Sequence, residues 1–212
     1  ERPGATGEGM CFKSKNEAIL AYENKAVTLH SRVKVRVEKT MPDGTVKSGI
    51  VESTVGRFIF NEIITQDLGF VDRSVPGNEL KLEVDFHVGK KQCKQILEKV
   101  INVHGASKTA ETLDDIKAIG YKYSTRAAMT VSISDMTVPA TKKQLLADAE
   151  ATVDRIAKNF RRGLITEEER YKEVIDVWKA TDDQLTHDLL TGLDKYNNIF
   201  MMADSGARGS DK

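Results

Sequence analysis

The sequence predicts an α+β protein, in which a small mixed region with a β-hairpin and short helices precedes a long antiparallel α-helical hairpin. Two patterns support this prediction. Residues 32–37 alternate strictly between charged and apolar side chains, as a half-buried strand does, whereas residues 140–190 contain no proline and repeat apolar residues at helical spacing. Charged residues make up 30% of the 212-residue chain and aromatic residues only 6%, which suits solvated helices better than a β-sandwich.

The mixed region begins with a glycine-rich extended loop over residues 1–12 and a short helix over residues 16–22. Two strands, at residues 32–37 and 46–53, are predicted to form a hairpin. The turn between them is Met41-Pro42-Asp43-Gly44, because proline presets φ for the second position of a turn and glycine tolerates positive φ.

The rest of this region is mostly helical. A helix is predicted over residues 57–64, followed by a connector at 65–80, and the fold of the stretch from 65 to 90 is not specified by the sequence. Helices over residues 91–104 and 107–120 follow, the first stopped by Gly105 and the second by Gly120. Residues 121–133 are predicted to be a strand or irregular.

The helix pair around Gly105 has the layout of a compact helix–turn–helix, which raises DNA binding as an interpretation. Its second helix carries Asp114 and Asp115 where a recognition helix needs Lys or Arg, so this interpretation is disfavoured. The whole chain has 32 basic and 32 acidic residues. With zero net charge it creates no global field that would draw it to nucleic acid or to a membrane.

The helical hairpin is the strongest structural prediction. Two amphipathic helices flank Arg162-Gly163-Leu164-Ile165 and must fold back on each other to bury their apolar stripes. Gly163 suits the position that closes the first helix, and Thr166 with Glu169 forms a capping box that opens the second. Each arm should be about 30 Å long or more. The stripes contain Leu145, Ala149, Val153, Ile156 and Phe160 in the first arm and Tyr171, Val174, Trp178, Leu185 and Leu189 in the second.

The tip of this hairpin has two interpretations. Leu164 and Ile165 either fold back on the stem as a hydrophobic staple or belong to a docking tip for another protein, with the surrounding charged residues facing the partner. The composition changes at Pro139. The predicted domains are therefore an α+β region at 1–138, the hairpin at 139–192 and a final loop at 193–212.

The sequence contains no complete catalytic apparatus. It has no Gly-x-Ser-x-Gly, P-loop or His-Glu-x-x-His motif. Cys11 and Cys93 are far apart, which fits a reducing cytoplasm and disfavours a zinc site or a disulfide framework. No apolar run approaches the roughly 18 residues of a membrane span, so we expect no membrane partner, no metal site and no catalytic residue. The histidines lack metal-ligand spacing and are interpreted as structural or surface residues: His30, His87, His104 and His187.

The last stretch carries the clearest functional signal. Apolar residues 199–202 run directly into a Gly/Ser loop that contains Arg208, and such a loop can point backbone N–H groups at a ligand. Arginine suits phosphate recognition, because its planar guanidinium is always charged and bonds bidentately. The alternative is a flexible tail, although a free tail gains nothing from apolar residues. The chain stops just beyond this motif and lacks an initiator methionine, so we expect a piece of a larger protein.

Several motifs resemble segments of the largest (β′) subunit of bacterial RNA polymerase, in the same order and over essentially the whole chain. The resemblance implies the pore and funnel domains, which line the secondary channel through which nucleotides reach the active site. The motifs are Glu1-Arg2-Pro3-Gly4-Ala5-Thr6-Gly7-Glu8-Gly9-Met10; Thr54-Val55-Gly56-Arg57 with Phe60-Asn61-Glu62; Arg126 through Asp135-Met136; Gly163-Leu164-Ile165-Thr166 with Glu169-Arg170-Tyr171; and Asn197 through Ser210, which matches the segment before the bridge helix.

The resemblance implies part of a nucleotidyltransferase that makes RNA from nucleoside triphosphates on a DNA template. The family's three aspartates that hold catalytic Mg²⁺ lie upstream of Glu1, so this chain is expected to hold no cofactor and to be inactive alone. The residue matching Arg208 lies near the triphosphate of the incoming nucleotide, where it would neutralise charge and orient the leaving pyrophosphate. Asp204, Ser205 and Ser210 match the same loop and are expected to shape it.

The hairpin resembles the rim helices at the mouth of the secondary channel. In that family, Gre-type transcript-cleavage factors and, in some bacteria, DksA-type factors dock there and push a tip towards the active site. The residues of this chain that match the docking region are Glu169, Arg170, Tyr171 and Asp176.

The sequence departs from proteobacterial relatives at positions linked to guanosine tetraphosphate. An Asn-Lys pair follows Glu-Arg-Tyr in those relatives, whereas Lys172-Glu173 stands here. At a second such site Asp114 fits, but Ala118 replaces a tyrosine. Both departures argue against alarmone binding to this chain.

The resemblance also implies partners: the β, α, ω and σ subunits, the nucleotide substrate, and DNA and RNA through the whole enzyme, in the cytoplasm at the nucleoid. The rival hypothesis is a free-standing adaptor whose helical hairpin binds a partner protein, with no link to polymerase. An adaptor should begin and end in solvated, dispensable residues. This chain begins in a glycine-rich motif and ends in an apolar run and a motif, which need neighbours.

Overall fold

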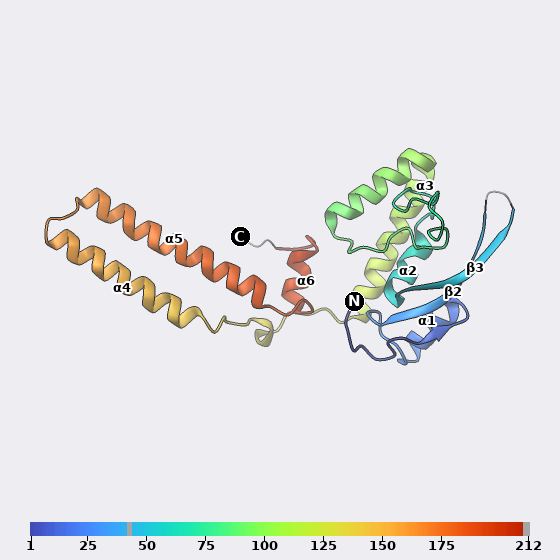
Figure 1. The fold of residues 1–212 in the computed structure, drawn as a ribbon, viewed down its shortest axis with the longest axis horizontal. Coiled ribbons are helices and arrows are strands. Elements are labelled where there is room, and N and C mark those ends of the chain that lie inside the picture. Colours follow the sequence, from blue (N-terminus) through green and yellow to red (C-terminus); the bar gives the residue numbers. More distant parts are fainter. Residues whose placement is uncertain (42–43, 210–212) are drawn as a thin grey trace. The chain divides into compact units, whose positions relative to one another are not determined.

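The computed structural model describes residues 1–41 and 44–209 (Figure 1). These residues form a three-stranded sheet and six α-helices, which confirms the predicted α+β class. The chain divides into two compact units, the first over Glu1–Ala128 and the second from Met129 onwards. The domain limit predicted at Pro139 falls further along, inside the second unit. None of the helices described is long and apolar enough to cross a bilayer.

The sheet has the strand order β1–β2–β3. β1 (Cys11–Phe12) lies parallel to β2 (Arg32–Thr40), which pairs antiparallel with β3 (Val46–Thr54). The predicted hairpin is thereby confirmed. Pro42 and Asp43 of its predicted turn lie outside the described residues, but the N–H of Met41 donates to the carbonyl of Thr45 (2.8 Å) across the turn.

A first hydrophobic cluster lies where the sheet meets α1 (Lys15–Glu23) and α2 (Val55–Ile63). Each helix is capped, because the hydroxyls of Ser14 and Thr54 accept bonds from backbone N–H groups three residues on (3.2 and 3.3 Å). The alternation in β2 turns its valines towards this cluster. Its members are Phe12, Ala18, Val27, Val33, Val35, Val55, Phe58, Ile59 and Leu82.

α3 runs from Lys90 to Arg126 and breaks at Gly105, whose φ of +79° and ψ of −177° are not helical. The two helices predicted on either side of Gly105 are therefore present. The predicted end at Gly120 is wrong, because the helix continues through Tyr121 to Arg126. The reason is tertiary: Tyr123 packs on the first cluster, with its ring centroid 6.4 Å from that of Tyr22, and this burial outweighs the poor helix propensity of glycine.

The connector between α2 and α3, residues 64–89, contains no helix or strand and is fastened to α2 by buried polar groups. The Asn61 side chain accepts a bond from the N–H of Val84 (3.0 Å) and donates to the carbonyl of the same residue (2.7 Å). The Gln66 amide donates to Asn61 Oδ1 and accepts from the N–H of Glu83 (3.1 Å each). These side chains supply the bonds that a strand partner would otherwise make.

Glu83 completes this network from a fully buried position. Its carboxylate accepts from the N–H of Phe70 (2.6 Å) and from the guanidinium of Arg73 (2.9 Å). Arg73 in turn donates to the carbonyls of Asn78 and Glu79 (3.1 and 2.8 Å). Around the network lies a second hydrophobic cluster, which joins the connector to α3 and consists of Ile64, Leu68, Val84, Ile96 and Val100.

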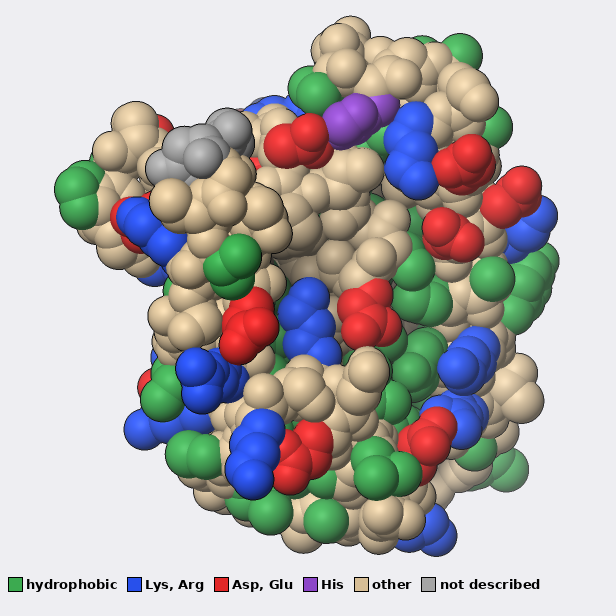
Figure 2. Space-filling model, turned by 90° about the vertical axis from the view of Figure 1, so that its right-hand side faces the viewer, with side chains coloured by type: hydrophobic (Ala, Val, Ile, Leu, Met, Phe, Trp, Pro, Cys, Tyr) green, Lys and Arg blue, Asp and Glu red, His purple; other side chains and the backbone are tan. Residues whose placement is uncertain are grey.

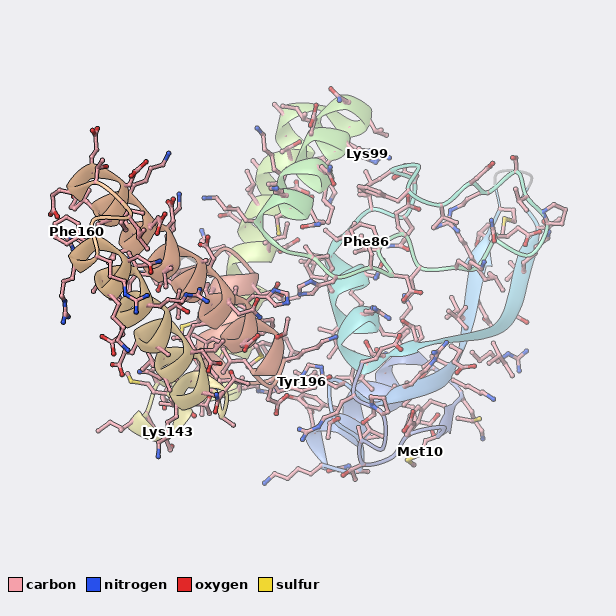
Figure 3. All side chains as sticks on the ribbon, turned by 60° about the vertical axis from the view of Figure 1, so that its left-hand side comes forward. Met10, Phe86, Lys99, Lys143, Phe160 and Tyr196 are labelled. Atoms are coloured by element: carbon pink, nitrogen blue, oxygen red, sulfur yellow. The ribbon has the colours of Figure 1, made fainter. Side chains whose placement is uncertain are left out.

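The second unit consists of the 3₁₀ turn η1 (Ile133–Asp135) and the helices α4 (Lys142–Arg161), α5 (Glu167–Gly192) and α6 (Asn198–Asp204). α4 and α5 lie side by side as the predicted antiparallel hairpin (Figures 1 and 3). Ala149 and Ile156 are buried between the arms.

Part of the predicted apolar stripe is not buried. Phe160 and Trp178 are each 38% exposed and Tyr171 is 63% exposed. Two helices bury only the side chains that point directly at the facing arm, so bulky residues at the flank of the stripe stay in contact with solvent.

On the face of the molecule shown in Figure 2, basic and acidic side chains are interspersed and do not gather by sign. This distribution agrees with the zero net charge of the sequence.

Candidate functional site

The tip of the hairpin begins with a Schellman motif at the end of α4. Gly163 has a φ of +73° and donates its N–H to the carbonyl of Phe160 (2.8 Å). The N–H of Leu164 donates to the carbonyl of Asn159 (3.1 Å). Glycine suits this position because the left-handed conformation costs it nothing, which confirms the helix end predicted from sequence.

α5 begins with the predicted capping box. The hydroxyl of Thr166 accepts from the N–H of Glu169 (3.2 Å), and the Glu169 carboxylate accepts from the N–H of Thr166 (2.8 Å). The bonds from Thr166 lower the pKa of the Glu169 carboxyl. Arg170 forms an ion pair with Glu167 and lies 5.6 Å from the centroid of the Phe160 ring on the other arm. Glu169 and Arg170 therefore hold the tip together.

The tip is open to solvent. Leu164 is 67% exposed, so the staple interpretation is wrong for this residue, whereas Ile165 is half-buried. Tyr171, Ile175 and Trp178 follow along α5 as an exposed apolar stripe at helical spacing. Sequence reasoning chose Val174 and missed Ile175, because both residues lie at helical spacing between Tyr171 and Trp178 and spacing alone does not separate them.

The four predicted docking residues all lie in the first half of α5. Glu169, Arg170 and Tyr171 are consecutive residues near its start. Asp176 is exposed and, seven residues after Glu169, returns to the same side of the helix. Glu169 and Arg170 have partners within the tip, whereas the side chains of Tyr171 and Asp176 are exposed and have no hydrogen-bond or ion-pair partner within residues 1–41 and 44–209.

The loop after α6 carries Arg208. The N–H of Arg208 donates to the carbonyl of Met202 (3.2 Å), and Gly206 takes a φ of +73° to turn the chain back. The guanidinium is exposed and makes no hydrogen bond or ion pair within residues 1–41 and 44–209. The structure thus fixes the backbone of this arginine and leaves its charge accessible.

The three residues predicted to support this loop differ in what they do. The hydroxyl of Ser205 donates to the carbonyl of Met202 (3.2 Å), the same acceptor that Arg208 uses. Asp204 is exposed and ends α6. Ser210 lies outside the described residues. Of the three, Ser205 has a defined part in the shape of the loop.

The base of the hairpin lies next to α6. The hydroxyl of Thr141, before α4, donates to Asp188 on α5 (2.7 Å), and the side chain of Asn197 donates to the carbonyl of Asp135 in η1 (2.9 Å). A hollow of about 550 Å³ lies between these segments. Sequence reasoning missed Asn197, although asparagine is among the preferred residues for the cap that it forms on α6.

Other polar residues singled out in the sequence lie elsewhere. Asp114, on α3, pairs with Lys117 (2.6 Å) and is exposed. His104 bonds to Asp67 (2.8 Å) in the first unit. Within the part of the chain that the structure describes, no three His, Cys, Asp or Glu residues are grouped so that they could hold a metal ion.

Comparisons with known proteins match most of the chain. The family model for RNA polymerase Rpb1, domain 3, matches residues 4–136, and that for domain 4 matches residues 165–212. The chain is 68% identical over its whole length to the DNA-directed RNA polymerase subunit β′ of Lachnoclostridium phytofermentans. It is 53% and 52% identical, over 99% of its length, to the β′ subunits of Caldicellulosiruptor saccharolyticus and Clostridium kluyveri. The chain spans 17% to 18% of the length of these relatives.

Proposed function

The chain belongs to the RNA polymerase Rpb1 family, as a segment of the DNA-directed RNA polymerase β′ subunit, and we propose that it lines the channel through which nucleotides reach the active site and docks the protein factors that use this channel. One observation carries the proposal: a single compact unit combines an exposed helical-hairpin tip with an accessible arginine loop. Family membership contradicts the alternative of an adaptor with no link to polymerase.

Arg208 is the residue assigned to the nucleotide. Its backbone is bonded to Met202 while its guanidinium has no carboxylate partner among the described residues, so its full charge can act on a ligand. A guanidinium bonds two phosphate oxygens at once, and its charge offsets the negative charge that develops as pyrophosphate leaves. Ser205 helps to shape the loop, with Asp204 and Ser210 beside it.

The hairpin tip is assigned to factor docking. Glu169 and Arg170 keep the tip rigid through the capping box and the pair with Glu167. Tyr171 and Asp176 then present an apolar ring and a negative charge to a partner. The complementary partner surface would be basic and apolar, and we assign it to a coiled-coil factor of the Gre or DksA type.

The remaining chemistry lies outside this chain. We assign catalytic Mg²⁺ to aspartates elsewhere in the β′ subunit, and expect this chain to be inactive alone. In the whole enzyme it would act with the β, α, ω and σ subunits on DNA and RNA, at the nucleoid in the cytoplasm. Asp114 is already paired with Lys117, which gives a second reason to doubt alarmone binding there.

The test is nucleotide kinetics in polymerase assembled with this sequence. Arg208→Ala should raise the KM for nucleotides by about fivefold or more, because a charge-assisted bond worth about 1–3 kcal/mol is lost. Lys195→Ala, which removes another exposed cation from the same unit, should leave KM unchanged. A parent-like KM for Arg208→Ala would contradict the assignment.

A further inference from the structure

Asn197 lies where the start of α6 meets η1, and both the oxygen and the nitrogen of its side-chain amide form hydrogen bonds. Oδ1 accepts from the N–H groups of Ile199 and Phe200 (2.9 and 3.4 Å), while Nδ2 donates to the carbonyl of Asp135 (2.9 Å). The orientation of the amide is determined by these partners, because a flipped amide would oppose donor to donor and acceptor to acceptor. One side chain thus joins a helix start to a separate segment.

The segment that Asn197 contacts is itself a hydrogen-bonded turn. The Asp135 carboxylate accepts from the N–H of Ser132 (2.8 Å), and the Ser132 hydroxyl accepts from the N–H of Ser134 (3.1 Å), which closes η1 as a capped turn. A few residues later the chain reaches Thr141, whose hydroxyl is bonded to Asp188 on α5 (2.7 Å). The carbonyl of Asp135 therefore belongs to a capped turn that lies six residues before the Thr141–Asp188 bond at the base of the hairpin.

A continuous set of bonds leads from Asn197 to Arg208. The N–H of Met201 donates to the Asn197 carbonyl (2.9 Å) within α6. The carbonyl of the next residue, Met202, accepts from the N–H of Arg208 and from the hydroxyl of Ser205 (3.2 Å each). α6 is seven residues long, so it is about 10 Å in length and moves as one short rod. A tilt at its capped end displaces the arginine loop at the other.

We propose that Asn197 is a positioning residue for Arg208: its bond to Asp135 sets the direction of α6 and hence the place of the guanidinium relative to the nucleotide phosphates. This inference rests on the proposed role of Arg208. A displacement of about 1 Å in a phosphate contact is enough to weaken transition-state or substrate binding severalfold.

The chain offers variants that separate the two functions of Asn197. Asn197→Asp keeps the oxygen that caps α6, since aspartate is an equally good cap, but removes the donor to Asp135. Asn197→Ala removes both functions. Asn198→Asp is the matched control, because Asn198 is the adjacent residue and its side chain makes no hydrogen bond within the described ranges.

The experiment measures KM and kcat for nucleotides in polymerase assembled with each variant, alone and combined with Arg208→Ala. Asn197→Asp should raise KM by about threefold to tenfold with little change in kcat. In the Arg208→Ala background it should cause no further increase, because the residue through which it acts is gone. Asn198→Asp should behave as the parent in both backgrounds.

Four outcomes would overturn the proposal. A parent-like KM for Asn197→Asp, with a raised KM for Arg208→Ala, removes the role of Asn197 and leaves that of Arg208 intact. An increase that adds in full to that of Arg208→Ala, or a loss confined to kcat, shows that Asn197 acts independently of the arginine. A parent-like KM for Arg208→Ala removes the proposed function itself, and the inference with it.

Discussion

Replacing Glu83 with alanine should destabilise the first unit and leave the helical hairpin unaffected. The Glu83 side chain has no exposed surface, and its two oxygens accept from the N–H of Phe70 (2.6 Å) and the guanidinium of Arg73 (2.9 Å). Without the carboxylate, a largely buried positive charge and a backbone donor lose their partner. The connector at residues 64–89 has no secondary structure with which to compensate.

The expected magnitude follows from burial. Removing one partner of a buried ion pair costs about 3–5 kcal/mol. Because Arg73 is 23% exposed and keeps its bonds to two carbonyls, we expect the lower end, about 3 kcal/mol. Glu79→Ala is the matched control, since Glu79 pairs with Lys47 over the same 2.9 Å but near the surface. Bonds from Lys47 and from the backbone N–H groups of Glu79 and Gly77 lower the pKa of Glu79 to about 2. Solvent nevertheless screens this pair, because Lys47 is 53% exposed, so its loss should have a much smaller effect.

The two units can be followed separately in one sample. The only tryptophan of the chain, Trp178, lies in α5, so its fluorescence reports the hairpin. Amide hydrogen exchange over residues 66–86 reports the connector. In denaturant, Glu83→Ala should speed exchange there and leave the Trp178 transition in place. Equal effects of Glu83→Ala and Glu79→Ala, or a shifted Trp178 transition, would refute the reasoning.

Three further predictions concern the hairpin and use the fluorescence of Trp178. Gly163→Ala should destabilise the hairpin by about 1–2 kcal/mol, because φ is +73° there and the left-handed region penalises a side chain; Gly192→Ala, in the last turn of α5, should not destabilise it. Ile156→Ala should cost more than Phe160→Ala, because Ile156 is 6% exposed and Phe160 is 38% exposed; the reverse order would show that the stripe is buried differently. The pKa of Glu169 is lowered from 4.5 in the folded state. The ionised Glu169 carboxylate therefore contributes its full stabilisation of the hairpin above pH 4.5, and this stabilisation is lost as pH falls through the folded pKa. The hairpin should be less stable in acid, and Glu169→Gln should make its stability less dependent on pH.

The sequence predicted correctly those elements that depend on residues close to one another in the chain. The helix ends at Gly163 and Thr166 follow from the conformational freedom of glycine and the reach of a capping side chain, and both occur where predicted. The strand at Arg32–Thr40 follows from its alternation, because one face of the sheet is buried.

Elements that depend on distant contacts were not predictable. The helix continues past Gly120 because Tyr123 meets the first cluster, which a sequence window cannot show. The connector owes its fold to Asn61, Gln66 and Glu83, which act across up to 23 positions and carry no periodic signal. Polar residues that bond backbone at long range resemble loop residues when they are read in order.

The candidate site likewise contains residues that the sequence could identify and contacts that it could not. Arg208 could be selected from its chemistry and its glycine-rich surroundings, and it lies in an exposed loop as that selection requires. The hydrogen bond from Asn197 to Asp135 could not be predicted from the sequence, because the two residues are 62 positions apart. Glu169 and Arg170 were selected for docking, but the structure gives both of them partners within the tip, which no spacing rule reveals.

Factor binding to the hairpin tests the central claim most directly. A Gre-type factor would be titrated calorimetrically into polymerase carrying this sequence, with the parent, Asp176→Lys and Asp154→Lys compared. Both aspartates are exposed, on α5 and α4 respectively, and substituting Glu169 is avoided because that would also break the capping box. Asp176→Lys should weaken binding by about tenfold or more, whereas Asp154→Lys should bind as the parent does. Equal affinity of all three, or no binding to the parent enzyme, would contradict the assignment of the hairpin as a docking site.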